Sequence, residues 1–290
     1  MDLKNRVSEV EQIIYKYLPS EEGLQKTVIE AINYSVKAGG KRLRPMLMQE
    51  TFKMFGGTSD VIEPFMAAIE MIHTYSLVHD DLPAMDNDEF RRGKKTTHAV
   101  YGEAMGILAG DGLLNFAFET ASKAFDIELS EKTAKAIQIL GNKAGMYGML
   151  GGQVVDIESE NKEINLDTLN FIHIKKTAAL IECSMLIGAV LAGADSRELD
   201  SMEKIARNVG LAFQIQDDIL DVTSSLEVLG KPIGSDDKNN KTTYVGIKGI
   251  EAAKEDVKSL TEDAIKEFDQ LSQKNDFLRE LLISLVGREK

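Results

Sequence analysis

Carboxylate and cationic side chains are crowded into one short stretch of this 290-residue chain, LVHDDLPAMDNDEFRRGKKTTH at residues 77–98. Asp80, Asp81 and Asp86 follow an apolar run, and Arg91 comes soon after them. Carboxylate oxygens without neighbouring cysteine are hard ligands that suit Mg²⁺, which also binds water and substrate phosphate. Arginine and lysine bind phosphate oxygens. The residue types therefore indicate a site for Mg²⁺ and a phosphate-bearing ligand.

A second acidic stretch, FQIQDDILDV at 213–222, falls late in an expected helix, as the first one does. Pro83 ends the first helix near Leu82, so both clusters lie at the negative end of a helix dipole, where carboxylates are unfavourable. Asp217 and Asp221 are also four residues apart and repel each other on one helical face. Bound cations would remove this conflict.

A third stretch, AGGKRLRPML at 38–47, carries the opposite charge and places Lys41, Arg42 and Arg44 at the positive end of a helix. Each cluster alone is common as a solvated turn or surface run. Several clusters that oppose their helix dipoles are typical of a functional site. We expect a diphosphate bridged through Mg²⁺ to the acidic clusters and a second anion on the basic side chains. No glycine-rich phosphate loop is present, which argues against a nucleotide.

The elements that must position these side chains are predicted to be helices, because apolar residues recur at helical spacing and no run alternates with period two. The predicted helices cover 3–18, 21–38, 45–55, 60–82, 97–125, 130–155, 166–193, 197–223, 249–272 and 276–288. Runs 71–79, 106–118 and 178–194 are apolar around much of their circumference and are expected to be central. No linker or repeat divides the chain, so we predict one all-α domain, 1–290.

The formal net charge of −13 argues against a nucleic-acid partner. The single cysteine, Cys183, cannot form an internal disulfide and is expected to be a buried, inert thiol. The N-terminus has no signal-peptide core, and the longest apolar run, 183–194, is too short to span a bilayer. The expectation is a cytoplasmic protein without membrane insertion.

The motifs, taken in order, resemble those of the short-chain trans-isoprenyl diphosphate synthases, most of all the bacterial farnesyl diphosphate synthases. They are GGKRLRP (39–45), HDDLPAMDNDEFRRGKKTTH (79–98), GGQVVDIE (151–158), HIKKTAAL (173–180), FQIQDDILD (213–221), LGKPIGSD (229–236) and NKTTY (240–244). The resemblance implies an isoprenoid-synthase-type helical bundle around a deep central cavity, a homodimer, and acidic motifs that face each other at the cavity mouth. It implies condensation of isopentenyl diphosphate with dimethylallyl or geranyl diphosphate to give (2E,6E)-farnesyl diphosphate.

The resemblance also implies roles for individual residues. Asp80 and Asp86 would bind two Mg²⁺ ions and Asp217 a third, with outer carboxylates supplied by Asp81, Asp218 and Asp221. The cations expected to bind the allylic diphosphate are Arg91, Lys176, Lys231 and Lys241. Those expected to bind isopentenyl diphosphate are Lys41, Arg44, His73 and Arg92. Thr177 and Gln214 would line the reaction centre, while Gln153 and Asp156 support the cavity. One departure is Ala178, where relatives usually have glycine, and His73 has a competing interpretation as a core histidine.

Product length depends on the residues just before the first acidic motif. By the 3.6-residue repeat, Ser76 shares the face of Asp80, whereas Tyr75 lies roughly 140° from it. Periodicity alone favours Ser76 as the wall of the pocket that would hold the growing prenyl tail, named here the tail pocket. The family resemblance instead favours Tyr75, because an aromatic residue at the fifth position before the motif blocks growth near fifteen carbons.

Four other functions remain open from the sequence. A geranylgeranyl diphosphate synthase would carry the same motifs. A terpene cyclase would have a different second metal motif and no need of GGKRLRP. An HD-type phosphohydrolase would need more than the four histidines of this chain. A non-catalytic prenyltransferase subunit usually lacks the acidic motifs, and both are present here.

Overall fold

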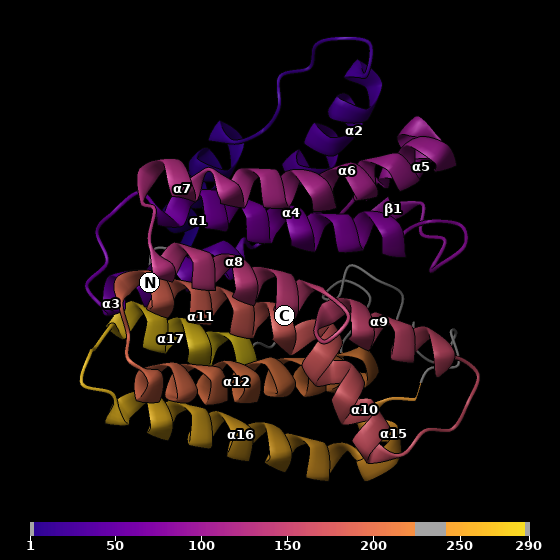
Figure 1. The fold of residues 1–290 in the computed structure, drawn as a ribbon. Helices are drawn as coiled ribbons and strands as arrows, with labels where there is room; N and C mark the ends of the chain where they lie inside the picture. The colour runs from indigo at the N-terminus through magenta and orange to yellow at the C-terminus, as the bar shows by residue number, and fades with distance from the viewer. Residues whose placement is uncertain (1–2, 224–241, 288–290) are drawn as a thin grey trace. The chain divides into compact units, whose positions relative to one another are not determined.

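The computed structural model describes residues 3–223 and 242–287. The predicted all-α class is confirmed, since helices dominate and the strands of the described residues form one short hairpin (Figure 1). Contacts divide the chain into two compact units, each described here by itself. Within the described residues, the N-terminal unit comprises 3–49 and 59–137, and the C-terminal unit comprises 50–58, 138–223 and 242–287. The single domain 1–290 stays a prediction.

The N-terminal unit is built around α4 (Ile62–Asp80) and α6 (Glu103–Ser122), which run side by side (Figure 1). Helix α4 is buried along most of its length, as predicted for a central element. Helix α6 is less enclosed than predicted for the run 106–118, because Ile107 and Leu108 are exposed. They approach closely at Gly110, where a Cβ atom would overlap the imidazole of His79. The other elements of this unit are α1 (Leu3–Lys16), α2 (Lys26–Lys37), β1 (Phe90–Arg91), β2 (Lys94–Lys95), α5 (Thr97–Tyr101) and α7 (Ala124–Ile127). Helices α3 (Leu43–Met54) and α8 (Glu131–Ala144) contribute residues to both units.

The C-terminal unit has α11 (Ala179–Ala192) and α12 (Ser196–Thr223) at its centre. Residues 179–191 of α11 are all buried, and this confirms the predicted central helix. Helix α16 (Ile250–Gln270) packs along α12, as Figure 1 shows. The remaining elements are α9 (Met149–Glu158), α10 (Leu166–Ile172), the π-helix η1 (His173–Ala178), α15 (Tyr244–Lys248) and α17 (Asp276–Val286). Cys183 is buried, as expected.

Several predicted helices are interrupted. The helix predicted over 97–125 breaks at Gly102, whose φ of 88° does not continue a right-handed helix. The helix predicted over 130–155 breaks between Ala144 and Met149, and η1 interrupts the one predicted over 166–193. The hairpin β1–β2 was not predicted, because strands of two residues are too short to show an alternating pattern. Its turn at Arg92 and Gly93 has positive φ at both positions, as type I′ hairpins require.

Candidate active site

The first acidic motif lies where α4 ends. The helix stops at Asp80, two residues before the predicted end near Leu82, and the chain then turns back. The backbone N–H of Asp86 donates to the Asp80 carbonyl at 2.9 Å, and Asn87, in a left-handed conformation, donates to the Leu82 carbonyl at 3.1 Å. Pro83, which was predicted to end this helix, lies within the returning segment. The backbones of the two predicted metal ligands are therefore adjacent although six positions separate them.

Asp81, which is buried, and Arg91, which is half-buried, form an ion pair beside this turn. The Arg91 Nε–H donates to Asp81 Oδ1 at 2.7 Å, and its NH2 nitrogen lies 2.6 Å from the same oxygen. Burial raises the pKa of Asp81, while the Arg91 guanidinium opposes that shift. Arg91 also lies 3.7 Å from Asp88. Asp81 thus holds in place a cation predicted to bind the allylic diphosphate, a role that its sequence position did not indicate.

Three cationic or potentially cationic groups of the N-terminal unit influence one another electrostatically. Burial lowers the pKa of Arg44 to about 10, and the nearby Arg92 charge adds to the effect. Burial also holds the pKa of His73 well below its usual value, assisted by the charges of Arg44 and Arg92, so His73 is neutral near pH 7. The Arg44 Nε has no hydrogen-bond partner although it is buried. A positive group whose buried donor has no partner is suited to binding an anion.

Arg92 is held by the glycine loop that precedes α3. Its guanidinium donates to the carbonyl of Gly39, and a Cβ atom at Gly40 would overlap it. Gly40 has a φ of 149°, which also favours glycine. The GGKRLRP loop and the hairpin arginine therefore lie together, as expected if both bind one diphosphate. Lys41, also predicted to bind it, is exposed.

Arg42, within the same basic stretch, has a structural role. Its side chain is buried and bonds to Glu70 at 2.7 Å, to the Val36 carbonyl at 2.7 Å and to Glu11 at 3.1 Å. These bonds tie the start of α3 to α1, α2 and α4. Only part of the positive charge at this helix end is therefore available to a ligand.

The predicted chain-length residues lie one turn before the metal motif on α4. Tyr75 is buried, and its ring packs edge-on against His79 with centroids 5.9 Å apart. Burial, and to a smaller extent the Asp80 charge, raises the pKa of Tyr75 to about 12. Ser76 is half-buried, and its hydroxyl donates to the His73 carbonyl at 2.9 Å.

In the C-terminal unit, a cavity of about 130 Å³ brings together several predicted site residues. Its lining consists of Asp156, Leu169, Ile172, His173, Lys176, Thr177, Gln214, Asp218, Thr242 and Thr243. Lys176 Nζ lies 2.6 Å from Asp156 Oδ2, and the Thr177 hydroxyl donates to Gln214 Oε1 at 2.9 Å. Lys176 and Thr177 lie in the π-helix η1, a distortion that is frequent at functional sites.

The second acidic motif forms the last turns of α12. Asp217 is partly exposed, whereas Asp218 and Asp221 are buried. Within the residues that the structure describes, no three carboxylate, histidine or cysteine groups converge on one point as a complete metal site. Mg²⁺ is normally held by one or two carboxylates together with substrate phosphates and water, so the donors present fit this ion. Lys231 and Lys241 lie outside the described residues.

His173 lines the same cavity of the C-terminal unit and Tyr244 stacks on it, and neither residue was assigned a role from the sequence. Both are buried, and their rings are stacked with centroids 6.4 Å apart. Each stands in a motif that carries the family resemblance, HIKKTAAL or NKTTY, which is the signal that could have indicated them.

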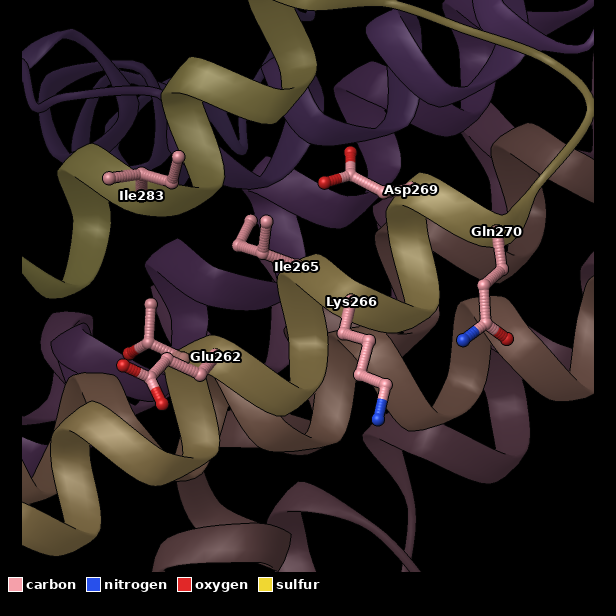
Figure 2. A pocket seen from close by; sticks show the side chains of 7 residues that line it. Glu262, Ile265, Lys266, Asp269, Gln270 and Ile283 are labelled. Atoms are coloured by element: carbon pink, nitrogen blue, oxygen red, sulfur yellow. The ribbon is translucent and has the colours of Figure 1, made fainter.

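A larger surface groove lies between α16 and α17 and contains none of the predicted site residues (Figure 2). It is lined by Thr261, Glu262, Ile265, Lys266, Asp269, Gln270 and Ile283. Glu262 and Lys266 carry opposite charges, and nothing in this groove resembles the acidic or basic clusters described above.

Comparison with known proteins decides the family. Residues 25–281 match the polyprenyl synthetase family. The chain belongs to this family. It is 45% identical to a farnesyl diphosphate synthase of Geobacillus stearothermophilus over 254 residues, 87% of this chain and 85% of the relative. It is also 45% identical to a geranylgeranyl diphosphate synthase of Cyanophora paradoxa over 266 residues, 91% and 88% of the two chains.

The fold agrees with this assignment. The crystal structure of an FPP/GFPP synthase from Zymomonas mobilis superposes with a TM-score of 0.87 at 32% identity, covering 98% of this chain and 97% of that one. The predicted resemblance to isoprenyl diphosphate synthases is confirmed, and so is the all-α isoprenoid-synthase fold class. The chain is a prenyltransferase, as predicted. No helix within the described residues is long and apolar enough to cross a membrane.

Proposed function

We propose that this prenyltransferase joins isopentenyl diphosphate to dimethylallyl or geranyl diphosphate and releases farnesyl diphosphate as its main product. Relatives that make farnesyl and geranylgeranyl diphosphate are equally identical to the chain, so identity does not choose between them. The observation that supports a fifteen-carbon product is the position of Tyr75, a buried aromatic residue about one helical turn before Asp80. A tail growing from the metal site into the apolar helices would meet this ring.

Three Mg²⁺ ions are proposed, two held by Asp80 and Asp86 and one by Asp217. When bound, Mg²⁺ neutralises the diphosphate as it leaves and so stabilises charge that develops in the transition state. Arg91, aligned by Asp81, and Lys176 would hold the allylic diphosphate with Lys231 and Lys241. The neutral His73 would donate a hydrogen bond to isopentenyl diphosphate beside Lys41, Arg44 and Arg92.

The proposed reaction breaks the carbon–oxygen bond of the allylic diphosphate, and the bonding electrons leave with the diphosphate. The double bond of isopentenyl diphosphate then forms a carbon–carbon bond with the allylic cation. A proton leaves the neighbouring carbon, giving a new trans double bond, and the departing diphosphate accepts it. Thr177 and Gln214 would line this reaction centre. The apolar helices would exclude water, which could otherwise quench the cation.

Mg²⁺ together with inorganic diphosphate is expected to raise Tm, since a ligand that binds only the native state stabilises it by about 2.7 kcal/mol at a hundredfold excess over Kd. Mg²⁺ alone should raise Tm less, because phosphate supplies part of its coordination. Differential scanning fluorimetry with Mg²⁺, diphosphate, both, or both plus EDTA measures this. An unchanged Tm with both present would contradict the assignment of the acidic clusters.

Lys41→Ala and Arg44→Ala should each raise the KM for isopentenyl diphosphate by about tenfold or more, because a hydrogen bond to a charged group contributes about 1.5–3 kcal/mol. The KM for geranyl diphosphate should change much less. Steady-state kinetics with each substrate varied in turn measure the difference, and Lys26→Ala, at an exposed lysine of the same unit, serves as the control. Equal effects on both substrates would argue against two separate diphosphate sites.

Incubation with Mg²⁺, isopentenyl diphosphate and an allylic primer separates the remaining alternatives. The proposed enzyme makes a longer prenyl diphosphate, whereas a cyclase makes a hydrocarbon or alcohol and a phosphohydrolase releases phosphate. A non-catalytic subunit does none of these alone. We also propose that the protein is a cytoplasmic homodimer. Sedimentation at several protein concentrations tests the oligomeric state.

A further inference from the structure

Three buried side chains from distant parts of the sequence meet in the C-terminal unit. They are His173 of η1, Asp218 of α12 and Tyr244 at the start of α15, named here the clasp. Asp218 Oδ2 accepts the backbone N–H of Tyr244 at 2.7 Å and lies 3.8 Å from His173 Nε2. The rings of His173 and Tyr244 stack at an interplanar angle of 25°. Each member therefore contacts both of the others.

Tyr244 is anchored from its other end as well. Its hydroxyl donates to Asp256 Oδ2 of α16 at 2.9 Å, and the Lys248 ammonium pairs with the same carboxylate. The Thr243 hydroxyl accepts the Gly246 N–H at 3.1 Å and caps α15. Contacts with α15 and α16 thus hold Tyr244 in addition to its contacts with His173 and Asp218.

The clasp continues into the residues predicted at the reaction centre. Gln214 Nε2 donates to Asp218 Oδ1 at 3.5 Å, and Gln214 Oε1 accepts the Thr177 hydroxyl at 2.9 Å. Because an amide has distinct donor and acceptor ends, a fixed Asp218 carboxylate sets which end of Gln214 faces Thr177. His173 lines the same cavity and precedes Lys176 by three residues in η1, within one turn of this π-helix.

We propose that His173, Asp218 and Tyr244 are positioning residues that align Gln214, Thr177 and Lys176 for the allylic diphosphate. The proposal rests on the proposed function and extends it to residues that carry no assigned role. Asp218 then acts through the protein, as an acceptor for the Tyr244 N–H and for Gln214, whereas the adjacent Asp217, which is partly exposed, is the predicted metal ligand. Two adjacent aspartates of one motif would have different tasks.

Tyr244→Leu removes the ring stack and is expected to lower kcat/KM for geranyl diphosphate by about 10- to 100-fold, because displacement of a reacting group by ~1 Å can cost about a hundredfold. The KM for isopentenyl diphosphate should stay within about twofold, since its predicted ligands lie in the N-terminal unit. Tyr244→Phe keeps the ring and the N–H and should retain most of the wild-type activity. Asp218→Asn keeps an oxygen acceptor and should retain far more activity than Asp218→Ala.

Phe268→Leu is the matched control, because Phe268 is a buried aromatic residue of α16 in the same unit and has no contact with the clasp among those described above. It should lower Tm without changing the ratio of the two KM values. If Tyr244→Leu and Phe268→Leu behave alike, Tyr244 only stabilises the fold and the proposal is overturned. Equal loss in Tyr244→Phe and Tyr244→Leu would overturn it too, because the stack would then be irrelevant.

A binding measurement separates this proposal from the proposed function. The rise in Tm caused by Mg²⁺ and inorganic diphosphate should be smaller in Tyr244→Leu than in the wild type, and unchanged in Phe268→Leu. A wild-type protein that binds these ligands but makes no prenyl product would overturn the proposed function alone. A Tyr244→Leu variant with the full Tm rise and full turnover would overturn the clasp alone.

Discussion

Replacement of Asp217 by alanine is expected to lower kcat by about 10²–10³-fold, the typical cost of removing one electrostatic stabiliser of transition-state charge. Asp80→Ala should have a similar effect, since Asp80 is the corresponding carboxylate of the first motif. Fold stability should change little, because both side chains lie at the negative end of a helix and Asp217 also repels Asp221. Single-turnover kinetics at saturating Mg²⁺ and substrates measure the effect on chemistry.

Asp200→Ala is the control for this experiment, since Asp200 is an exposed aspartate on the same helix as Asp217. It should leave kcat and the ligand-induced rise in Tm unchanged, whereas Asp217→Ala should lose much of that rise. Asp217→Ala with wild-type turnover would exclude a catalytic metal at the second motif. A large loss of Tm without ligand would instead make Asp217 a structural residue.

Much of the fold could be predicted from the sequence because the signals are local. The helical spacing of apolar residues indicated most helices, and the run around 178–194 proved to be α11, which is buried over residues 179–191. Pro83 indicated that α4 ends close to Leu82, and the helix stops at Asp80. These features depend on residues that are close together in the sequence.

The features that were missed depend on contacts between distant residues or on very short elements. Arg42 looks like Lys41 in the sequence, but a carboxylate 28 positions away, on Glu70, neutralises it. The π-helix η1 changes the hydrogen-bond register without changing the apolar pattern, so periodicity does not detect it. The hairpin β1–β2 has two residues in each strand.

The sequence was enough to predict which residue types make up the candidate site, but not which of them contact one another. The charges and their helix ends indicated Mg²⁺ and two anions, and the family resemblance gave each residue a role. The bond from Arg91 to Asp81 and the contacts of Tyr244 needed the structure. In both cases the second aspartate of an acidic pair is buried and its neighbour is partly exposed, a difference in burial that two identical side chains cannot show in the sequence.

Replacement of Tyr75 by alanine is expected to shift the main product from farnesyl to geranylgeranyl diphosphate. Tyr75 is buried one turn before Asp80, and its ring packs against His79, so its removal opens space beside the predicted tail pocket. Ser76→Phe should act in the opposite sense and favour geranyl diphosphate, since Ser76 shares the Asp80 face of the helix. Chromatography of the dephosphorylated products measures chain length in each variant.

Loss of packing is the competing explanation, because truncation of a buried aromatic residue to alanine costs about 3–5 kcal/mol wherever it lies. Phe65→Ala provides the comparison, since Phe65 is a fully buried aromatic residue of α4 about four turns before Asp80. Both variants should lower the free energy of unfolding, but only Tyr75→Ala should lengthen the product. If Tyr75→Ala is destabilised and still makes only the fifteen-carbon product, Tyr75 is a core residue and the floor of the tail pocket lies elsewhere. If Phe65→Ala also lengthens the product, a loosened helix α4 explains the change better than a wall at Tyr75.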